Sequence, residues 1–167
     1  MVEVRLSAVR VDLRSNTPVL LLTETQGAGR TLPIFIGAPE ATAIAFAIQG
    51  VETTRPMTHD LLEVVINELG ACLERIVITH LESATYYAEL HLSQGDEEHV
   101  VSSRPSDAVA LAVRTSSPLY VSDELMDQEG MILPPDVDDD SGEDNPEEIV
   151  GEFREFLQGV RPEDFSS

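Results

Sequence analysis

The stretch from Arg75 to Arg114, RIVITHLESATYYAELHLSQGDEEHVVSSRPSDAVALAVR, contains three strand-like runs followed by one helix-like run. The strand-like runs are rich in β-branched and aromatic residues and cover residues 75–81, 85–92 and 99–102. The link Gly95, Asp96 and Glu97 is typical of a hairpin turn. Pro105 suits the first turn of a helix that we expect to extend to Arg114. Because strands follow one another without an intervening helix, this stretch predicts neighbouring strands that pair.

Strand-like and helix-like runs also lie before and after this stretch. Three earlier strand-like runs cover residues 2–13, 18–23 and 30–36, and a change of phase near Ser7 and Ala8 predicts a β-bulge. Two helices are then expected, from Pro39 to Gln49 and from a Thr58 cap to Leu69, with Gly50 and Gly70 as their ends. Their predicted buried faces are Ala41, Ile44, Ala45 and Ile48 in the first, and Leu61, Leu62, Val65 and Leu69 in the second. A short strand (119–121) and a short helix (122–128) complete the pattern.

The element order βββααβββαβα predicts the α+β class rather than a doubly wound parallel fold. We expect residues 1–135 to form a single domain in which helices pack on a mixed, largely antiparallel sheet. Residues 136–145 are nearly devoid of apolar side chains and predict a flexible acidic linker. Residues 146–167 predict a C-terminal amphipathic helix and tail.

Charge excludes several classes of function. The chain has 31 acidic residues against 10 basic ones, every basic residue is Arg, and the net charge is −21. Catalysis by lysine is therefore excluded, and nonspecific binding of nucleic acid through a basic face is not expected. No apolar run is long enough to span a membrane and the N-terminus lacks signal-peptide features, so we expect a cytoplasmic protein. Cys72 cannot form an intramolecular disulfide and is expected to be a half-buried thiol at a helix end.

Two short motifs share one design and carry the candidate site. Arg55-Pro-Met-Thr-His-Asp60 and Arg104-Pro-Ser-Asp107 each place an Arg-Pro before a hydroxyl and an aspartate at the start of a helix-like run. A guanidinium, a hydroxyl, free backbone N–H groups and a carboxylate then lie within one turn of a helix start. Such an arrangement holds anions and metal-bound phosphates.

These residue types suggest individual roles. Asp60 and Asp107, with Glu40 at a third helix start, are candidate ligands of Mg²⁺ or Mn²⁺, because hard cations prefer carboxylate oxygens. Arg55 and Arg104 are candidates for binding phosphate with two hydrogen bonds, and Thr58 and Ser106 for contacting the substrate. His59 is the best-placed general base or metal ligand of the four histidines. The alternative is structural: carboxylates that stabilise helix dipoles, arginines in salt bridges, and a histidine that caps or packs. Tyr86 and Tyr87 could stack on a base or divide between core and surface.

With these motifs, the chain resembles the bifunctional nuclease domain family of bacteria and plants. The resemblance spans roughly residues 1–133 and is carried by PIFIGAPEATAIA (33–45), GVETTRPMTHDLL (50–62), LESATYYAEL (81–90) and RPSDAVALAVR (104–114). It implies an α+β domain that self-associates, with a dimer favoured, and that cleaves DNA and RNA. It also implies one functional cluster made of Glu40, Arg55, Thr58, His59, Asp60, Arg104, Ser106 and Asp107. Many members carry an acidic residue shortly before the second Arg-Pro, where this chain has Ser102 and Ser103.

Three hypotheses follow. The first is a metal-assisted nuclease of weak activity, because the field of a highly acidic chain slows its encounter with nucleic acid. The second is a non-enzymatic binding or regulatory module for a small phosphate ligand or an acidic partner segment. The third is that the acidic tail mimics nucleic acid and occupies the chain's own Arg-lined cleft, so that removing residues 136–167 would increase activity or anion binding.

Overall fold

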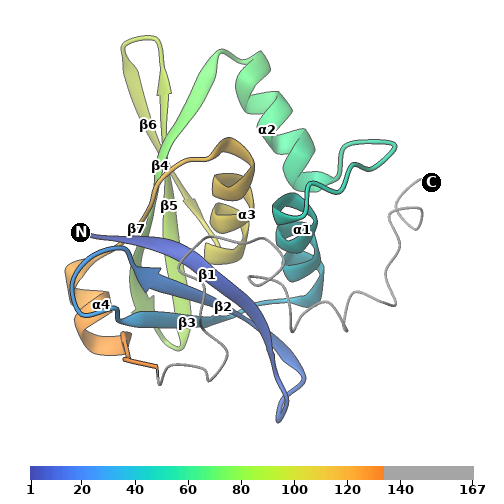
Figure 1. The fold of residues 1–167 in the computed structure, drawn as a ribbon. Helices are drawn as coiled ribbons and strands as arrows, with labels where there is room; N and C mark the ends of the chain where they lie inside the picture. Colours follow the sequence, from blue (N-terminus) through green and yellow to red (C-terminus); the bar gives the residue numbers. More distant parts are fainter. Residues whose placement is uncertain (134–167) are drawn as a thin grey trace.

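Residues 1–133, the part of the chain that this computed structural model describes, form seven strands and four helices (Figure 1). The strands are β1 (Val2–Asp12), β2 (Thr17–Glu24), β3 (Thr31–Phe35), β4 (Ala71–Glu82), β5 (Thr85–Gln94), β6 (Glu97–Ser103) and β7 (Leu119–Val121). The helices are α1 (Ala38–Ile48), α2 (Thr58–Glu68), α3 (Pro105–Thr115) and α4 (Asp123–Glu129). The element order expected from the sequence is confirmed. The predicted linker (136–145) and C-terminal helix (146–167) lie outside the described residues.

All seven strands belong to one sheet, in the order β3-β2-β1-β7-β4-β5-β6. β4 and β7 pair in parallel, whereas each other neighbouring pair in the described part of the chain is antiparallel. The predicted mixed, largely antiparallel sheet and the α+β class are therefore confirmed. The register of β1 against β2 shifts between Leu6 and Ala8, which confirms the β-bulge expected there.

α3 lies at the centre of the helical layer, in contact with α1 and α2 and with strands β4 and β5 (Figure 1). Its residues Ala108 to Ala112 are all buried. The small side chains Ala108, Ala110 and Ala112 leave room for α1, whose own buried residues include Ala41 and Ala45. This close packing fixes the starts of both helices relative to one another.

α2 packs differently from the sequence expectation. The predicted buried residues Leu61, Leu62, Val65 and Leu69 are all exposed, and His59 is its one buried residue. α3 already covers the centre of the sheet beside β4 and β5, and α2 contacts the domain through a few residues that include His59, Asp60 and the partly buried Ile66. The homo-oligomer expected from the family resemblance stays a prediction.

Two local expectations at the ends of α2 were also wrong. The residue before the helix is Met57 rather than a Thr58 cap, and its backbone N–H donates to Asp60 Oδ2 over 2.8 Å. Cys72 is exposed and lies in β4, because this strand begins at Ala71, directly after the turn at Gly70. No helix within residues 1–133 is long and apolar enough to cross a membrane.

The β4–β5 turn offers a test of backbone strain. Ser83 and Ala84 both have left-handed backbone conformations, with φ of 49° and 61°. A two-residue turn of this kind favours Asn-Gly, because other side chains are disfavoured at positive φ. The double change Ser83→Asn/Ala84→Gly is expected to raise the free energy of unfolding by about 1 kcal/mol. Urea unfolding measures this change. Gly95, a turn residue with φ of 60°, offers the opposite test: Gly95→Ala should lower the free energy of unfolding by a similar amount. If the Ser83→Asn/Ala84→Gly variant also lowered the free energy of unfolding, the assignment of strain to Ser83 and Ala84 would be contradicted.

Candidate functional site

The two Arg-Pro motifs meet through a histidine–aspartate hydrogen bond. His59 Nε2, in the first turn of α2, lies 2.9 Å from Asp107 Oδ1, in the first turn of α3. Arg104, the residue that precedes α3, places Nη2 2.9 Å from Glu40 Oε1 in the first turn of α1. The starts of three helices therefore converge on one cluster, formed by Glu40, His59, Arg104 and Asp107. We call it the polar cluster.

Asp107 is held from both sides. Arg104 donates from Nε to Asp107 Oδ2 over 2.7 Å and from Nη2 to Oδ1 over 3.0 Å. Burial acts to raise the pKa of Asp107, but the hydrogen bonds from Arg104 and His59 outweigh it, so this pKa lies below its ordinary value of 3.8. The hydrogen bonds and charges of Asp107 and Glu40 raise the pKa of Arg104 in turn. Both groups are therefore charged at neutral pH.

One nitrogen of Arg104 lies between two carboxylates. Nη2 contacts Glu40 Oε1 at 2.9 Å and Asp107 Oδ1 at 3.0 Å, so both oxygens face one position that holds positive charge. Mg²⁺ in proteins is commonly bound by one or two carboxylates together with waters and substrate phosphates. Glu40 and Asp107 fit such a two-carboxylate arrangement. Within residues 1–133, no group of three or more His, Cys, Asp or Glu side chains is arranged to hold a metal ion.

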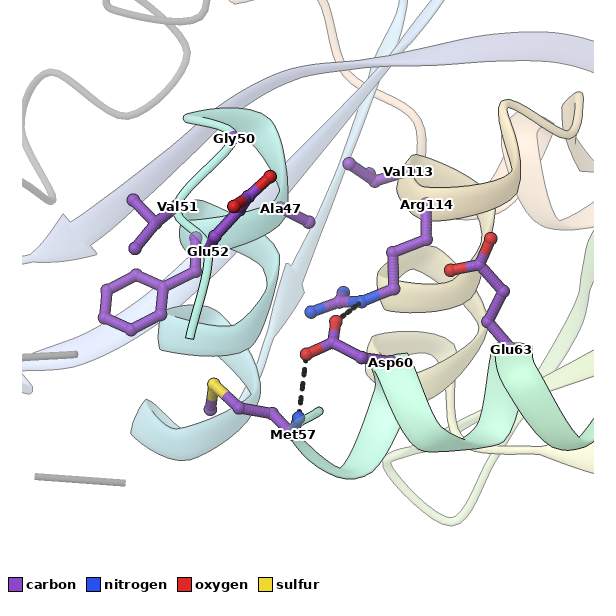
Figure 2. Close-up of a pocket in the computed structure, with 10 residues that line it drawn as sticks. Ala47, Gly50, Val51, Glu52, Met57, Asp60, Glu63, Val113 and Arg114 are labelled. Carbon is purple, nitrogen blue, oxygen red and sulfur yellow. Dashed lines mark hydrogen bonds and ion pairs between the residues drawn. The ribbon is translucent and has the colours of Figure 1, made fainter. Parts of the chain in front are cut away.

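Asp60, the third predicted metal ligand, has other partners. Its Oδ1 lies 2.5 Å from Arg114 Nε, and its Oδ2 accepts the hydrogen bond from Met57 described above. Arg114 also donates to the backbone carbonyls of Ala110 (2.8 Å) and Ala43 (3.1 Å), and its side chain is only 6% exposed. Figure 2 shows this pair at a pocket of about 490 Å³ between α1, α2 and α3. The structure therefore gives Asp60 and Asp107 no common partner.

The remaining predicted residues fall into two groups. Ser106 is buried and lines a second pocket together with Arg104. Arg55 and Thr58 are exposed, and the Arg55 side chain forms no ion pair with any residue between 1 and 133. Two arginines were predicted to bind phosphate. Within residues 1–133, Arg104 belongs to the polar cluster and Arg55 does not.

This second pocket, the Arg104 pocket, has a volume of about 330 Å³, within the usual range of ligand sites. Its wall is formed by the start of β2, the end of β3 and the residues that follow it, the β4–β5 turn with the start of β5, and the start of α3. The lining residues are Thr17, Ile34, Phe35, Ile36, Gly37, Ala84, Thr85, Tyr86, Arg104, Pro105 and Ser106. Gly37 lets the chain pass close to Glu40, whose carboxylate occupies the space that a Cβ would need.

Sequence reasoning missed Arg114, Phe35 and Gly37. Arg114 could have been found, because a charged residue that ends an otherwise apolar helix needs a carboxylate partner when it is buried. Phe35 and Gly37 gave no such signal, since their place beside Arg104 depends on how β3 lies against α3.

Comparisons with known proteins show the family to which the chain belongs. Residues 20–134 match the model of the bifunctional nuclease domain family. An uncharacterized protein of Mycobacterium tuberculosis is 44% identical over 167 residues, which cover 100% of this chain and 99% of that protein. Bifunctional nuclease 2 of Arabidopsis thaliana is 30% identical over 115 residues, covering 67% of this chain but 35% of the plant protein. Bifunctional nuclease of Oryza minuta is 25% identical over 124 residues, or 71% of this chain and 38% of that protein. On this match, which covers more than half of its length, the chain belongs to the bifunctional nuclease domain family.

Proposed function

We propose that this protein hydrolyses phosphodiester bonds in DNA and RNA at the polar cluster. The observation that carries the proposal is the convergence of both Arg-Pro motifs on Asp107, with Arg104 extending from that cluster to the wall of a ligand-sized pocket. The names of the plant relatives support the same chemistry. Because the plant proteins are nearly three times as long as the matched segment, their activity is transferred here only as a proposal.

Arg104 is proposed to bind the phosphate. A guanidinium matches two phosphate oxygens with two hydrogen bonds, and the Arg104 side chain is largely exposed. Its present partners are Glu40 and Asp107, so a phosphate must compete with two carboxylates for it. Ser106, in the same pocket, is proposed as a second contact to the substrate.

Glu40 and Asp107 are the residues that would hold a divalent cation, Mg²⁺ or Mn²⁺. When bound, such an ion neutralises phosphate charge and lowers the pKa of a water ligand. Asp60 forms an ion pair with Arg114. The proposal therefore does not use Asp60 as a metal ligand.

His59 is proposed to position Asp107. An ionised carboxylate can only accept a hydrogen bond, so Nε2 of His59 is the donor in this contact. His59 is only 8% exposed and lines neither pocket described above. Orienting the carboxylate therefore suits it better than removing a proton from a water in the Arg104 pocket.

Turnover is expected to be slow. Residues 1–133 contain 19 acidic residues against 8 arginines, so the surface repels a nucleic-acid backbone. Raising the ionic strength screens this repulsion. The chain is therefore expected to act on short or single-stranded substrates rather than to move along a duplex.

The test is cleavage of labelled single-stranded DNA and RNA by the full chain, with Mg²⁺, with Mn²⁺ and with a chelator. Glu40→Gln should reduce metal-dependent cleavage by about 100-fold, because it removes one of two carboxylate charges. Asp96→Asn, which removes one charge from the exposed β5–β6 turn, is the matched control and should cleave like the unchanged protein.

Each outcome discriminates between the hypotheses. Cleavage that the chelator abolishes and Glu40→Gln reduces supports the nuclease. Equal cleavage by all three proteins would identify a contaminating enzyme and contradict the proposal. Phosphate binding without any cleavage would instead support the non-enzymatic binding module.

A further inference from the structure

The lining of the Arg104 pocket combines two kinds of residue. Arg104 and Ser106, at the start of α3, are polar groups of the kind that bind an anion. Phe35 and Tyr86 are aromatic. A ligand that fills this pocket therefore pairs a negative charge with an apolar, flat surface.

Phe35 is exposed at the end of β3. Of its surface, 60% is accessible, whereas Ile34 and Ile36 on either side are buried, because successive side chains of a strand point to opposite faces of the sheet. Tyr86 is partly buried and packs against the hydrophobic core, so its ring forms a firmly held wall. Burial, and secondarily the charge of Glu129, raise the pKa of Tyr86, so its hydroxyl stays neutral at physiological pH.

We infer that this pocket binds one nucleotide unit of a single strand, with the base against Phe35 and Tyr86 and the phosphate at Arg104. This inference rests on the proposed function and names the part of the substrate that the site recognises. Stacking on aromatic rings accepts every base, because each base has a π-face. A site of this kind would act on both DNA and RNA.

A duplex does not suit the same pocket, because its bases are stacked on one another. Holding a duplex would also require a row of free arginines along the backbone. Arg30 is paired with Glu24 and Asp127, Arg114 with Asp60, and Arg75 is hydrogen-bonded to His91. At the Arg104 pocket itself, the expected contacts are stacking on the two aromatic residues and one phosphate contact at Arg104. The slope of log K against log salt for a single strand should then be near −0.7, the value for about one neutralised phosphate.

Tryptophan fluorescence tests the inference directly. The chain contains no Trp, so Phe35→Trp introduces a single reporter that keeps an aromatic ring in the pocket. Adenosine 5′-monophosphate should quench this fluorescence with saturation, and ribose 5-phosphate, which lacks the base, should not. Leu13→Trp is the control: Leu13 is 93% exposed and lies outside the lining of the Arg104 pocket, so its fluorescence should not respond.

A second measurement separates stacking from folding. Phe35→Ala should weaken binding of adenosine 5′-monophosphate and raise KM for a single-stranded oligonucleotide about tenfold, with kcat and the melting temperature nearly unchanged. Equal binding of adenosine 5′-monophosphate by Phe35→Ala and the unchanged protein would overturn the inference, even if cleavage is observed. Stacking without cleavage would leave the nucleotide site standing and overturn the proposed nuclease, so the two failures are distinguishable.

Discussion

Asp107→Asn is expected to reduce cleavage of DNA and RNA by about 100-fold to 1,000-fold, the cost of losing one charge-stabilising group in an active site. Asp107 is the one residue of the polar cluster that contacts both His59 and Arg104, so its charge orients both side chains. Steady-state cleavage of a labelled single-stranded oligonucleotide measures the effect. Asp96→Asn again serves as the matched control. A fall of less than about threefold, in a variant that remains folded, would remove Asp107 from the proposed site.

Asp107→Asn is also expected to change how the free energy of unfolding depends on pH. The pKa of Asp107 in the folded protein is below 3.8, so the unfolded chain binds a proton on this carboxyl at higher pH than the folded one. The stability contributed by the Asp107 carboxylate is therefore complete above about pH 5 and is lost as pH falls through the folded-state pKa. Asp107→Asn should show a smaller loss of stability between neutral and acid pH than the unchanged protein. Identical pH profiles would mean that the ion pair with Arg104 does not stabilise the fold.

Asp60→Asn is expected to lower the free energy of unfolding by about 3 kcal/mol, because it leaves the charge of Arg114 buried without an anion. The Arg114 side chain is 6% exposed, whereas that of Asp60 is 36% exposed. Removing the arginine instead leaves a carboxylate that can reach water and keeps the Met57 hydrogen bond. Arg114→Met should therefore cost only about 1 kcal/mol. Urea unfolding of the two variants compares these values.

The double variant Asp60→Asn/Arg114→Met tests whether the unpaired charge of Arg114 causes the loss of stability in Asp60→Asn. Once the guanidinium is gone, the Asp60–Arg114 position carries no buried charge, and the double variant should be more stable than Asp60→Asn alone. A double variant less stable than either single change would contradict the ion pair as the origin of the effect. If Asp60 instead binds a catalytic metal, Asp60→Asn would lower activity without this rescue pattern in stability.

Local patterns predicted the fold well, because most elements carry their own start and stop signals. Pro105 marked the start of α3, Gly50 and Gly70 followed the ends of α1 and α2, and the phase change near Ser7 marked the bulge. The burial of α2 was predicted wrongly for a tertiary reason. Its leucines and valines follow a helical period, but α3 occupies the place on the sheet that they would cover.

The sequence predicted which residues belong to the candidate site, but it did not predict which of them pair with one another. His59 and Asp60 are neighbours in the sequence, yet successive residues of a helix point about 100° apart. His59 therefore turns toward Asp107 while Asp60 turns toward Arg114. The exposed ring of Phe35 beside Arg104 likewise depends on β3 ending next to the start of α3.

The sequence by itself determined the α+β class, the order of the elements, the acidic character and the two Arg-Pro motifs, because these depend on periodicity, composition and residues near one another in the chain. The tertiary structure decided which charges pair, which apolar face stays exposed and which aromatic rings share a pocket with Arg104. The reason is physical: Asp107, His59 and Glu40 are far apart along the chain, and only the packing of α1, α2 and α3 brings their side chains within hydrogen-bonding distance of common partners.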